Sequence, residues 1–167
     1  HIAENAVAVL AAASLAGADM LRVVAAFAEV RAGKGRGQRL QLQTGNGAFA
    51  VIDESYNANP ASMAAAIALL ASAVPDAGGR RIAVLGDMLE MGEFSADVHA
   101  ELADPLCESE IDDIWLAGVD MAHLRDALGQ RKQVVYRDTA DALAEYALDN
   151  VRPGDVLMIK SSNGTGF

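Results

Sequence analysis

The chain has 167 residues, of which 52% are hydrophobic and 22% charged, and its formal net charge at pH 7 is −10. This length suits one domain, or one domain and part of another, and the hydrophobic content excludes an intrinsically disordered protein. The negative charge argues against unassisted binding to nucleic acid or an anionic membrane, because both would repel the chain. The single cysteine, Cys107, cannot form an internal disulfide, which is typical of a reducing cytoplasm.

The first part of the chain is predicted to be helical. An alanine-rich helix presents one apolar face, which we expect to be buried and which contains Val7, Leu10, Ala11 and Leu15. Gly17 is expected to end this helix, and Asp19 to cap a second helix that runs to about Val30. Because the chain starts at His1 without Met and stops just beyond a predicted strand, we expect it to be a piece of a longer protein.

Residues 31–37 interrupt the helical pattern, since they hold three glycines and three cations, Arg31, Lys34 and Arg36. This composition predicts a flexible, solvated link, and we place a domain boundary there, between residues 1–33 and 34–167. No complete phosphate-binding loop of the form Gly-x-x-x-x-Gly-Lys-[Ser/Thr] occurs in the chain. Two interpretations of Arg36 stay open: a guanidinium that reaches a phosphate on a partner domain, or a basic linker residue in an acidic protein.

The segment after the link predicts a β-hairpin followed by a helix. Residues 40–43 alternate as a half-buried strand does, Asn46-Gly47 suits a type I′ turn, and residues 49–52 form the returning strand. Asn59 is expected to cap a helix that begins at Pro60. Its apolar stripe is predicted to contain Met63, Ile67, Leu70 and Val74.

Four short apolar runs follow, at residues 82–85, 114–117, 134–136 and 156–159. Helical stretches lie between them, one with an apolar stripe of Val98, Leu102 and Leu106, another capped near Asp138 with a stripe of Leu143 and Ala147. Continuous apolar strands that alternate with amphipathic helices indicate a parallel sheet covered on both faces. We therefore predict an open α/β domain whose mostly parallel sheet starts with an antiparallel hairpin.

Open parallel sheets bind ligands beyond the carboxyl ends of their strands. Four segments are predicted to lie there: residues 53–59, 86–87, 118–120 and 160–164. The first of them is the richest in chemistry, because it combines two acids, a hydroxyl, a phenol and two amides before a helix start. Its carboxylates could orient a cation, a water or an ammonium group; the alternative is a capped turn with solvated acids.

The other polar residues favour structural roles. Asp87 lies where a ligand would sit, yet an Asp in such a loop is also a common helix cap. His99 and His123 form no metal constellation with the cysteine, and His99 is interpreted as a helix-surface or inter-helix residue rather than a base. Cys107 is interpreted as a small buried residue.

Two motifs resemble those of the Mur ligase family. The first is Asp53-Glu54-Ser55-Tyr56-Asn57-Ala58-Asn59-Pro60, followed by Ser62-Met63, and the second is Leu85-Gly86-Asp87-Met88-Leu89-Glu90-Met91-Gly92, with His99 downstream. The opening His1-Ile2-Ala3-Glu4-Asn5-Ala6 resembles the helix that closes the family's central ATPase domain. Glu54 stands where Asp is more common in the family, and Lys160-Ser161-Ser162 where Lys-Gly-Ser is usual.

The resemblance implies the last part of a three-domain enzyme: helices of the central ATPase domain, then a Rossmann-like C-terminal domain. The motifs are most similar to those of the branch that adds D-alanyl-D-alanine to UDP-N-acetylmuramoyl-tripeptide through an acyl phosphate, in the bacterial cytoplasm. ATP and Mg²⁺ would be held mainly by the missing central domain, so this fragment alone would be inactive and would hold no metal ligand.

The resemblance also implies roles for individual residues. Catalytic roles fall to Arg36 and Glu54, and nucleotide contacts to Asn5, Arg36 and Tyr56. Substrate contacts would come from Asp53, Ser55, Asn57 and Asn59. Two alternatives stay open: a stand-alone, non-catalytic binding module derived from such a ligase, and a folate polyglutamylating ligase, against which the Tyr-Asn-Ala-Asn-Pro run argues.

Overall fold

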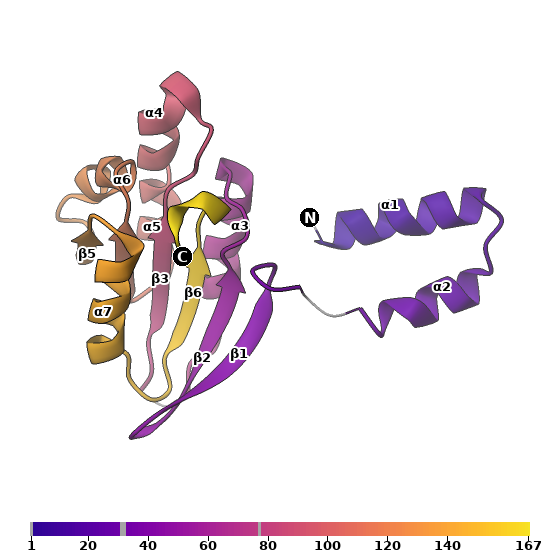
Figure 1. Ribbon diagram of the computed structural model, residues 1–167, viewed down its shortest axis with the longest axis horizontal. Helices are drawn as coiled ribbons and strands as arrows, with labels where there is room; N and C mark the ends of the chain where they lie inside the picture. Colours follow the sequence, from indigo (N-terminus) through magenta and orange to yellow (C-terminus); the bar gives the residue numbers. More distant parts are fainter. Residues whose placement is uncertain (1, 31–32, 77) are drawn as a thin grey trace. The chain divides into compact units, whose positions relative to one another are not determined.

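The computed structural model describes residues 2–30, 33–76 and 78–167 (Figure 1). His1, which the sequence analysis placed in the opening motif, lies outside the described residues, as do Arg31 and Ala32 of the predicted link. The chain divides into two compact units, one up to residue 32 and one from Gly33 to Phe167.

The first unit contains helices α1 (Ile2–Leu15) and α2 (Met20–Phe27). Gly17 follows α1 with a φ of 74°, a conformation that glycine adopts without strain. The Asp19 carboxylate caps α2 by accepting a hydrogen bond of 3.0 Å from the Leu21 amide. The two predicted helices and the Asp19 cap are therefore confirmed, although α2 ends at Phe27, before the predicted Val30.

The predicted burial of the first helix is wrong for this unit. Val7 is 64% exposed and Leu15 is 91% exposed, and α2 contains no buried residue. The reason is size, because two short helices have too little apolar surface between them to enclose one another. No helix among the described residues has the length and apolar character needed to cross a membrane.

The second unit is built on a sheet of six strands in the order β1-β2-β6-β3-β4-β5. β1 pairs with β2 antiparallel, and the remaining neighbours are parallel, which confirms the predicted α/β fold with its initial hairpin (Figure 1). The strands are β1 (Gln38–Thr44), β2 (Gly47–Glu54), β3 (Arg81–Gly86), β4 (Asp113–Ala117), β5 (Val134–Arg137) and β6 (Val156–Lys160).

The hairpin turn lies one residue earlier than predicted. Thr44 and Gly47 are paired, so Gly45 and Asn46 form the turn, and Asn46 does not adopt the positive φ of a type I′ turn. The Thr44 hydroxyl accepts a hydrogen bond from the Asn46 amide at 3.3 Å and donates one to the Gly47 carbonyl at 2.8 Å. The Thr44 side chain therefore organises the turn, and the Asn46-Gly47 pattern gives no sign of this role.

The helices of the second unit are α3 (Pro60–Ala71), α4 (Ser95–Ala100), α5 (Ala103–Glu108), α6 (Met121–Leu128) and α7 (Ala140–Asn150), with 3₁₀ turns η1 (Gly92–Phe94) and η2 (Asn163–Thr165). The predicted cap of α3 is confirmed, whereas Val74 lies beyond its end and is 87% exposed. α7 is capped by Thr139 rather than Asp138. α6 was not predicted, since its few buried residues are separated by polar ones.

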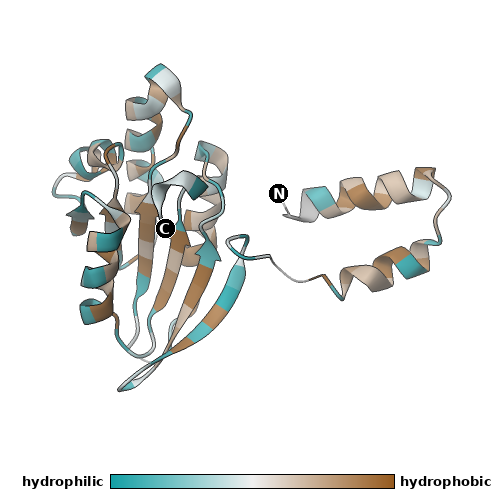
Figure 2. Ribbon diagram, viewed as in Figure 1, coloured by the Kyte–Doolittle hydropathy of each residue, from teal (hydrophilic) through white to brown (hydrophobic). Residues whose placement is uncertain are grey.

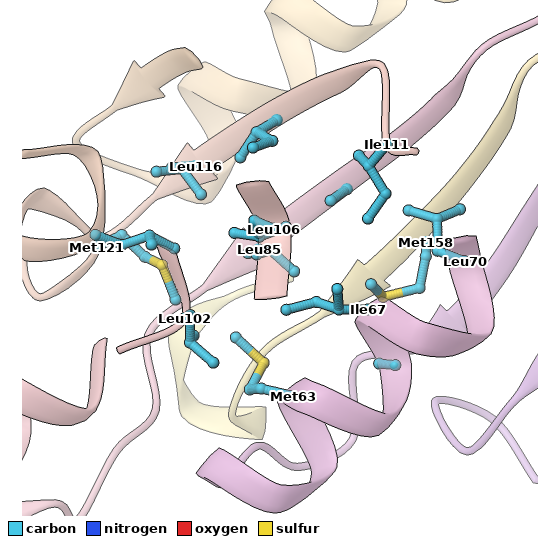
Figure 3. Close-up of a cluster of buried hydrophobic side chains, with 14 of the residues drawn as sticks. Met63, Ile67, Leu70, Leu85, Leu102, Leu106, Ile111, Leu116, Met121 and Met158 are labelled. Atoms are coloured by element: carbon cyan, nitrogen blue, oxygen red, sulfur yellow. The ribbon is translucent and has the colours of Figure 1, made fainter. Parts of the chain in front are cut away.

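Alternating residues of the central strands face two hydrophobic clusters. Ala83 and Leu85 of β3 face the cluster that contains α3, α5 and α6 (Figure 3), and Ile82 and Val84 face the cluster that contains Leu143 of α7. Figure 2 shows the inner strands as mostly hydrophobic, with hydrophilic positions frequent on the edge strand β1. The parallel sheet thus carries helices on both faces, as its continuous apolar strands require.

A cluster of ion pairs lies at the amino ends of β3, β4 and β6. Asp155 is fully buried; it accepts hydrogen bonds from the backbone amides of Arg80 and Arg152 and lies 2.6 Å from the Arg80 guanidinium. The same guanidinium contacts Asp113 at 2.6 Å. These contacts, first among them the side-chain hydrogen bond to Asp155, raise the pKa of Arg80.

We expect Asp155→Ala to lower the free energy of unfolding by about 3 kcal/mol, because it leaves buried donors without their acceptor. Urea denaturation of the protein measures this loss. Asp104→Ala is the matched control: its pair with Arg131 is largely exposed, so the loss should stay below about 1 kcal/mol. Equal losses in the two variants would contradict the structural role of Asp155.

Candidate functional site

The carboxyl ends of β2, β6, β3 and β4 share one edge of the sheet. Glu54 pairs with Lys160, Lys160 with Leu85, and Gly86 with Ala117 in the strand register. The four polar segments predicted from the sequence follow these strand ends, so the parallel pairing brings them to the same edge, as expected.

A glycine-rich loop, residues 33–37, packs against the end of β2. The Gly35 amide donates to the Asp53 carboxylate at 3.1 Å, and the Tyr56 amide donates to the Gly35 carbonyl at 3.0 Å. The Gly37 amide donates to the Asp53 carbonyl at 2.8 Å. The described part of the predicted flexible link is therefore not a free linker: backbone hydrogen bonds hold it to the strand end.

Gly35 is required at this contact. Its φ is 71°, and a Cβ placed there would lie 2.8 Å from the Tyr56 nitrogen. The absence of a side chain lets the two backbone segments approach, and the residue is buried. At Gly37, with a φ of 86°, a Cβ would lie 3.1 Å from the Glu54 carboxylate. Both glycines thus leave room for residues of the acidic segment.

Arg36 lies between these glycines, and its guanidinium carbon is 3.9 Å from the centre of the Tyr56 ring. Such a cation–π contact contributes roughly 0.5–1 kcal/mol at an exposed site. Tyr56 is 46% exposed, and no ion pair to Arg36 occurs among residues 33–76 and 78–167. The contact gives the guanidinium a defined position while its hydrogen-bond donors remain on the surface.

Asp53 and Ser55 bond to each other. The Asp53 carboxylate accepts the Ser55 hydroxyl at 2.6 Å and the Ser55 amide at 3.1 Å, besides the Gly35 amide. Asp53 and Ser55, which were predicted to contact the substrate, thus bond to each other and to the glycine-rich loop in this structure. Glu54, at the end of β2, is half-buried and is the remaining acid of the segment.

The two asparagines differ in their surroundings. Asn59 caps α3: its side chain accepts the Ser62 amide at 2.8 Å, and the Ser62 hydroxyl accepts the Asn59 amide at 3.0 Å. Asn57 is exposed, and its side-chain oxygen accepts the Ala58 amide at 2.9 Å. Asn5 lies on α1 of the first unit, whereas the other predicted site residues lie in the second unit.

Lys160 belongs to the segment 160–164 that was predicted to lie at this edge, but the sequence analysis gave it no individual role. It is 2% exposed, and its Nζ donates to the Asn57 carbonyl at 2.7 Å and to the Glu54 carbonyl at 3.5 Å. Burial lowers the pKa of Lys160, and the negative charge of Glu54 counteracts part of that shift. The available signal was a lysine directly after four apolar residues of a predicted core strand.

The neighbouring loops of the edge are bonded to one another. The Asp87 carboxylate accepts the Met121 amide at 2.9 Å at the start of α6, which agrees with the helix-cap interpretation. The Asp87 carbonyl accepts the Ser162 amide at 3.1 Å, and the Ser162 hydroxyl accepts the Leu89 amide at 3.0 Å. These bonds tie the loop after β3 to the loops after β4 and β6.

His99 supports the same loop from inside the protein. It is fully buried; its Nε2 accepts the Met88 amide at 2.9 Å, and its Nδ1 lies 2.7 Å from the Ser95 carbonyl. This arrangement requires the tautomer that carries its proton on Nδ1. His99 is therefore a buried residue with structural hydrogen bonds, which agrees with the preference for a structural role over a base but excludes a helix-surface position.

The described residues differ in what they offer a phosphate and a metal ion. They contain no group of three or more His, Cys, Asp or Glu side chains arranged to hold a metal, and Asp53 already accepts three hydrogen bonds. The Arg36 guanidinium has the charge and the donors that a phosphate binds. A hollow of about 760 Å³ between α7 and the hairpin is lined mainly by apolar residues and by none of the predicted site residues.

We expect Gly35→Ala to lower the free energy of unfolding by roughly 1–3 kcal/mol, because it combines a positive φ with a backbone clash. The measurement is urea denaturation. Gly33→Ala in the same loop is the control, since its Cβ would meet only Arg36 Cδ at 3.9 Å, and its effect should stay within about 0.5 kcal/mol. A neutral Gly35→Ala would show that the loop does not need this contact.

Comparisons with known proteins find similarity to one family. The family described as Mur ligase, glutamate ligase domain, matches residues 35–163. A UDP-N-acetylmuramoyl-tripeptide–D-alanyl-D-alanine ligase of Mycobacterium tuberculosis (strain CDC 1551 / Oshkosh) is 32% identical over 186 residues, which cover 100% of this chain and 36% of the relative.

Solved structures of Mur ligases have the same fold as this chain. A crystal structure of MurF from Acinetobacter baumannii matches with a TM-score of 0.78 and 27% identity, covering 99% of this chain and 35% of that one. The MurF ligase from Thermotoga maritima, solved in complex with ADP, matches in fold with a TM-score of 0.70 at 22% identity, covering 93% of this chain and 33% of that one. The chain thus spans about a third of the length of these relatives.

Proposed function

The chain belongs to the Mur ligase family, and from that membership we propose that it is the C-terminal part of an ATP-dependent ligase. The full enzyme would join D-alanyl-D-alanine to UDP-N-acetylmuramoyl-tripeptide during peptidoglycan synthesis in the bacterial cytoplasm. The whole-chain similarity to a ligase of that name supports this substrate pair. Residues 1–33 would belong to a central ATPase domain, and residues 34–167 would form the C-terminal domain.

The observation that carries the proposal is the position of Arg36. Two backbone–backbone hydrogen bonds, a third bond from the Gly35 amide to the Asp53 carboxylate, and the Tyr56 ring hold this cation beside an acidic strand end, at the edge where such sheets bind ligands. A cation placed in advance can stabilise a transferring phosphoryl group without reorganisation during the reaction. We assign Arg36 to the γ-phosphate, with Asn5 and Tyr56 as further nucleotide contacts.

ATP supplies the phosphoryl group that converts the tripeptide carboxylate into an acyl phosphate, from which phosphate leaves as the amide bond forms. Glu54 is assigned to the incoming dipeptide: its carboxylate would hold the ammonium group and take up the proton that the amine loses before attack. Asp53, Ser55, Asn57 and Asn59 would shape and line the dipeptide site. The described residues contain no group of three or more His, Cys, Asp or Glu side chains that could hold a metal ion, and Mg²⁺ would be held mainly by the missing central domain.

In the full-length enzyme, we expect Arg36→Ala to lower kcat/KM by about 10²-fold or more, as loss of one stabilising donor does in other enzymes. Release of phosphate coupled to ligation measures the rate. Arg39→Ala is the control, because Arg39 is an exposed cation on the neighbouring strand β1. Unchanged turnover of Arg36→Ala would leave Arg36 as a linker residue and remove the main support for its assigned role.

The isolated chain is expected to fold without hydrolysing ATP, since its sequence contains no complete phosphate-binding loop. The measurement is phosphate release by the purified chain with ATP and Mg²⁺, with and without D-alanyl-D-alanine. Turnover that depends on magnesium would contradict this expectation. If the full-length protein bound these substrates but formed no product, the alternative of a non-catalytic binding module would be favoured.

A further inference from the structure

Lys160 is a buried charged residue at the end of a strand whose other residues are hydrophobic. It is the last residue of β6, and its register partners are Glu54 of β2 and Leu85 of β3. Lysine is almost never fully buried unless its charge is paired, yet this side chain is 2% exposed. An apolar residue would fill the same space without the cost of removing an ammonium group from water.

The ammonium group contributes hydrogen bonds that an apolar side chain cannot. Its Nζ lies 2.7 Å from the Asn57 carbonyl and 3.5 Å from the Glu54 carbonyl. These two carbonyls flank Ser55 and Tyr56, so one side chain holds both ends of the short turn that carries the predicted site residues. A charged donor makes a stronger bond than a neutral one, which suits a fixed loop.

The turn of residues 54–57 also holds Arg36 in position. Tyr56 contacts the Arg36 guanidinium through its ring and the Gly35 carbonyl through its amide. A change in the path of residues 54–57 would therefore move the Glu54 carboxylate, the Tyr56 ring and Arg36 together. The hydrogen bonds of Lys160 reach this group through the backbone of the turn, and no ion pair between Lys160 and Glu54 occurs among the described residues.

We propose that Lys160 is a positioning residue of the ligase site, which holds the turn of residues 54–57 in the geometry that binds D-alanyl-D-alanine. This inference rests on the proposed function. It assigns to the last residue of β6 a role in substrate affinity that acts through the turn and not through contact with the substrate. The lowered pKa of Lys160, caused mainly by burial, agrees with a cation that has given up water for two carbonyl partners.

The chain offers a matched control for this inference. Lys132 Nζ also donates to two backbone carbonyls, those of Ser109 at 3.1 Å and Ile111 at 3.0 Å. That pair lies before β4, at the opposite end of the strands from the candidate site. Lys132→Met and Lys160→Met thus remove the same kind of contact, one away from the site and one beneath it.

The experiment compares both variants in the full-length enzyme by steady-state kinetics and by hydrogen exchange of the backbone amides. For Lys160→Met we expect the KM for D-alanyl-D-alanine to rise about tenfold and exchange to accelerate at residues 54–58. For Lys132→Met we expect neither change. A purely structural role would reduce the amount of folded enzyme, which lowers the apparent kcat and leaves KM unchanged.

Two outcomes would overturn the inference: unchanged exchange at residues 54–58 in Lys160→Met, or faster exchange with an unchanged KM. If Lys160→Met does not fold, Lys160→Gln replaces it, because glutamine keeps a hydrogen-bond donor at this position. We expect its KM for D-alanyl-D-alanine to exceed that of the wild type by less than tenfold. If the wild-type enzyme makes no pentapeptide product, the proposed function fails, and the exchange measurement alone decides whether Lys160 holds the turn.

Discussion

The Asp53 carboxylate accepts hydrogen bonds from the Gly35 amide and from both the amide and the hydroxyl of Ser55. This single side chain joins the glycine-rich loop to the end of β2 and shapes the turn that follows. This attachment, together with two backbone hydrogen bonds of Gly35 and Gly37, gives Arg36 a fixed place beside Tyr56. Without this carboxylate, two backbone hydrogen bonds, from the Gly37 amide to the Asp53 carbonyl and from the Tyr56 amide to the Gly35 carbonyl, would remain to hold the segment that carries Arg36.

The strand order decides which other groups meet at this edge. β6, the last strand of the chain, lies between β2 and β3, so Lys160 is inserted beneath the turn that follows β2. The loops on the far side of β6 are joined by Asp87 and Ser162 and supported from within by His99. The result is a rim of loops bonded to one another, in which a catalytic group can be held at a constant position.

Much of the fold could be predicted from local patterns. Short apolar runs specified the four strands that follow the hairpin, because a strand covered on both faces needs apolar residues throughout. Asn59-Pro60 specified the start of α3, since a helix cap involves only residues three apart. Local patterns failed where a side chain outside the expected dipeptide organised the backbone, as Thr44 does in the hairpin turn.

The sequence by itself therefore determined the strands, most helices, the α/β class and the family motifs, all of which are encoded in neighbouring residues. Only the tertiary structure decided how the candidate site is assembled. The bond between Gly35 and Asp53 spans 18 residues, and the bond between Lys160 and Asn57 spans 103. No local pattern encodes such contacts, because they form only after the strand order has brought distant segments to one edge.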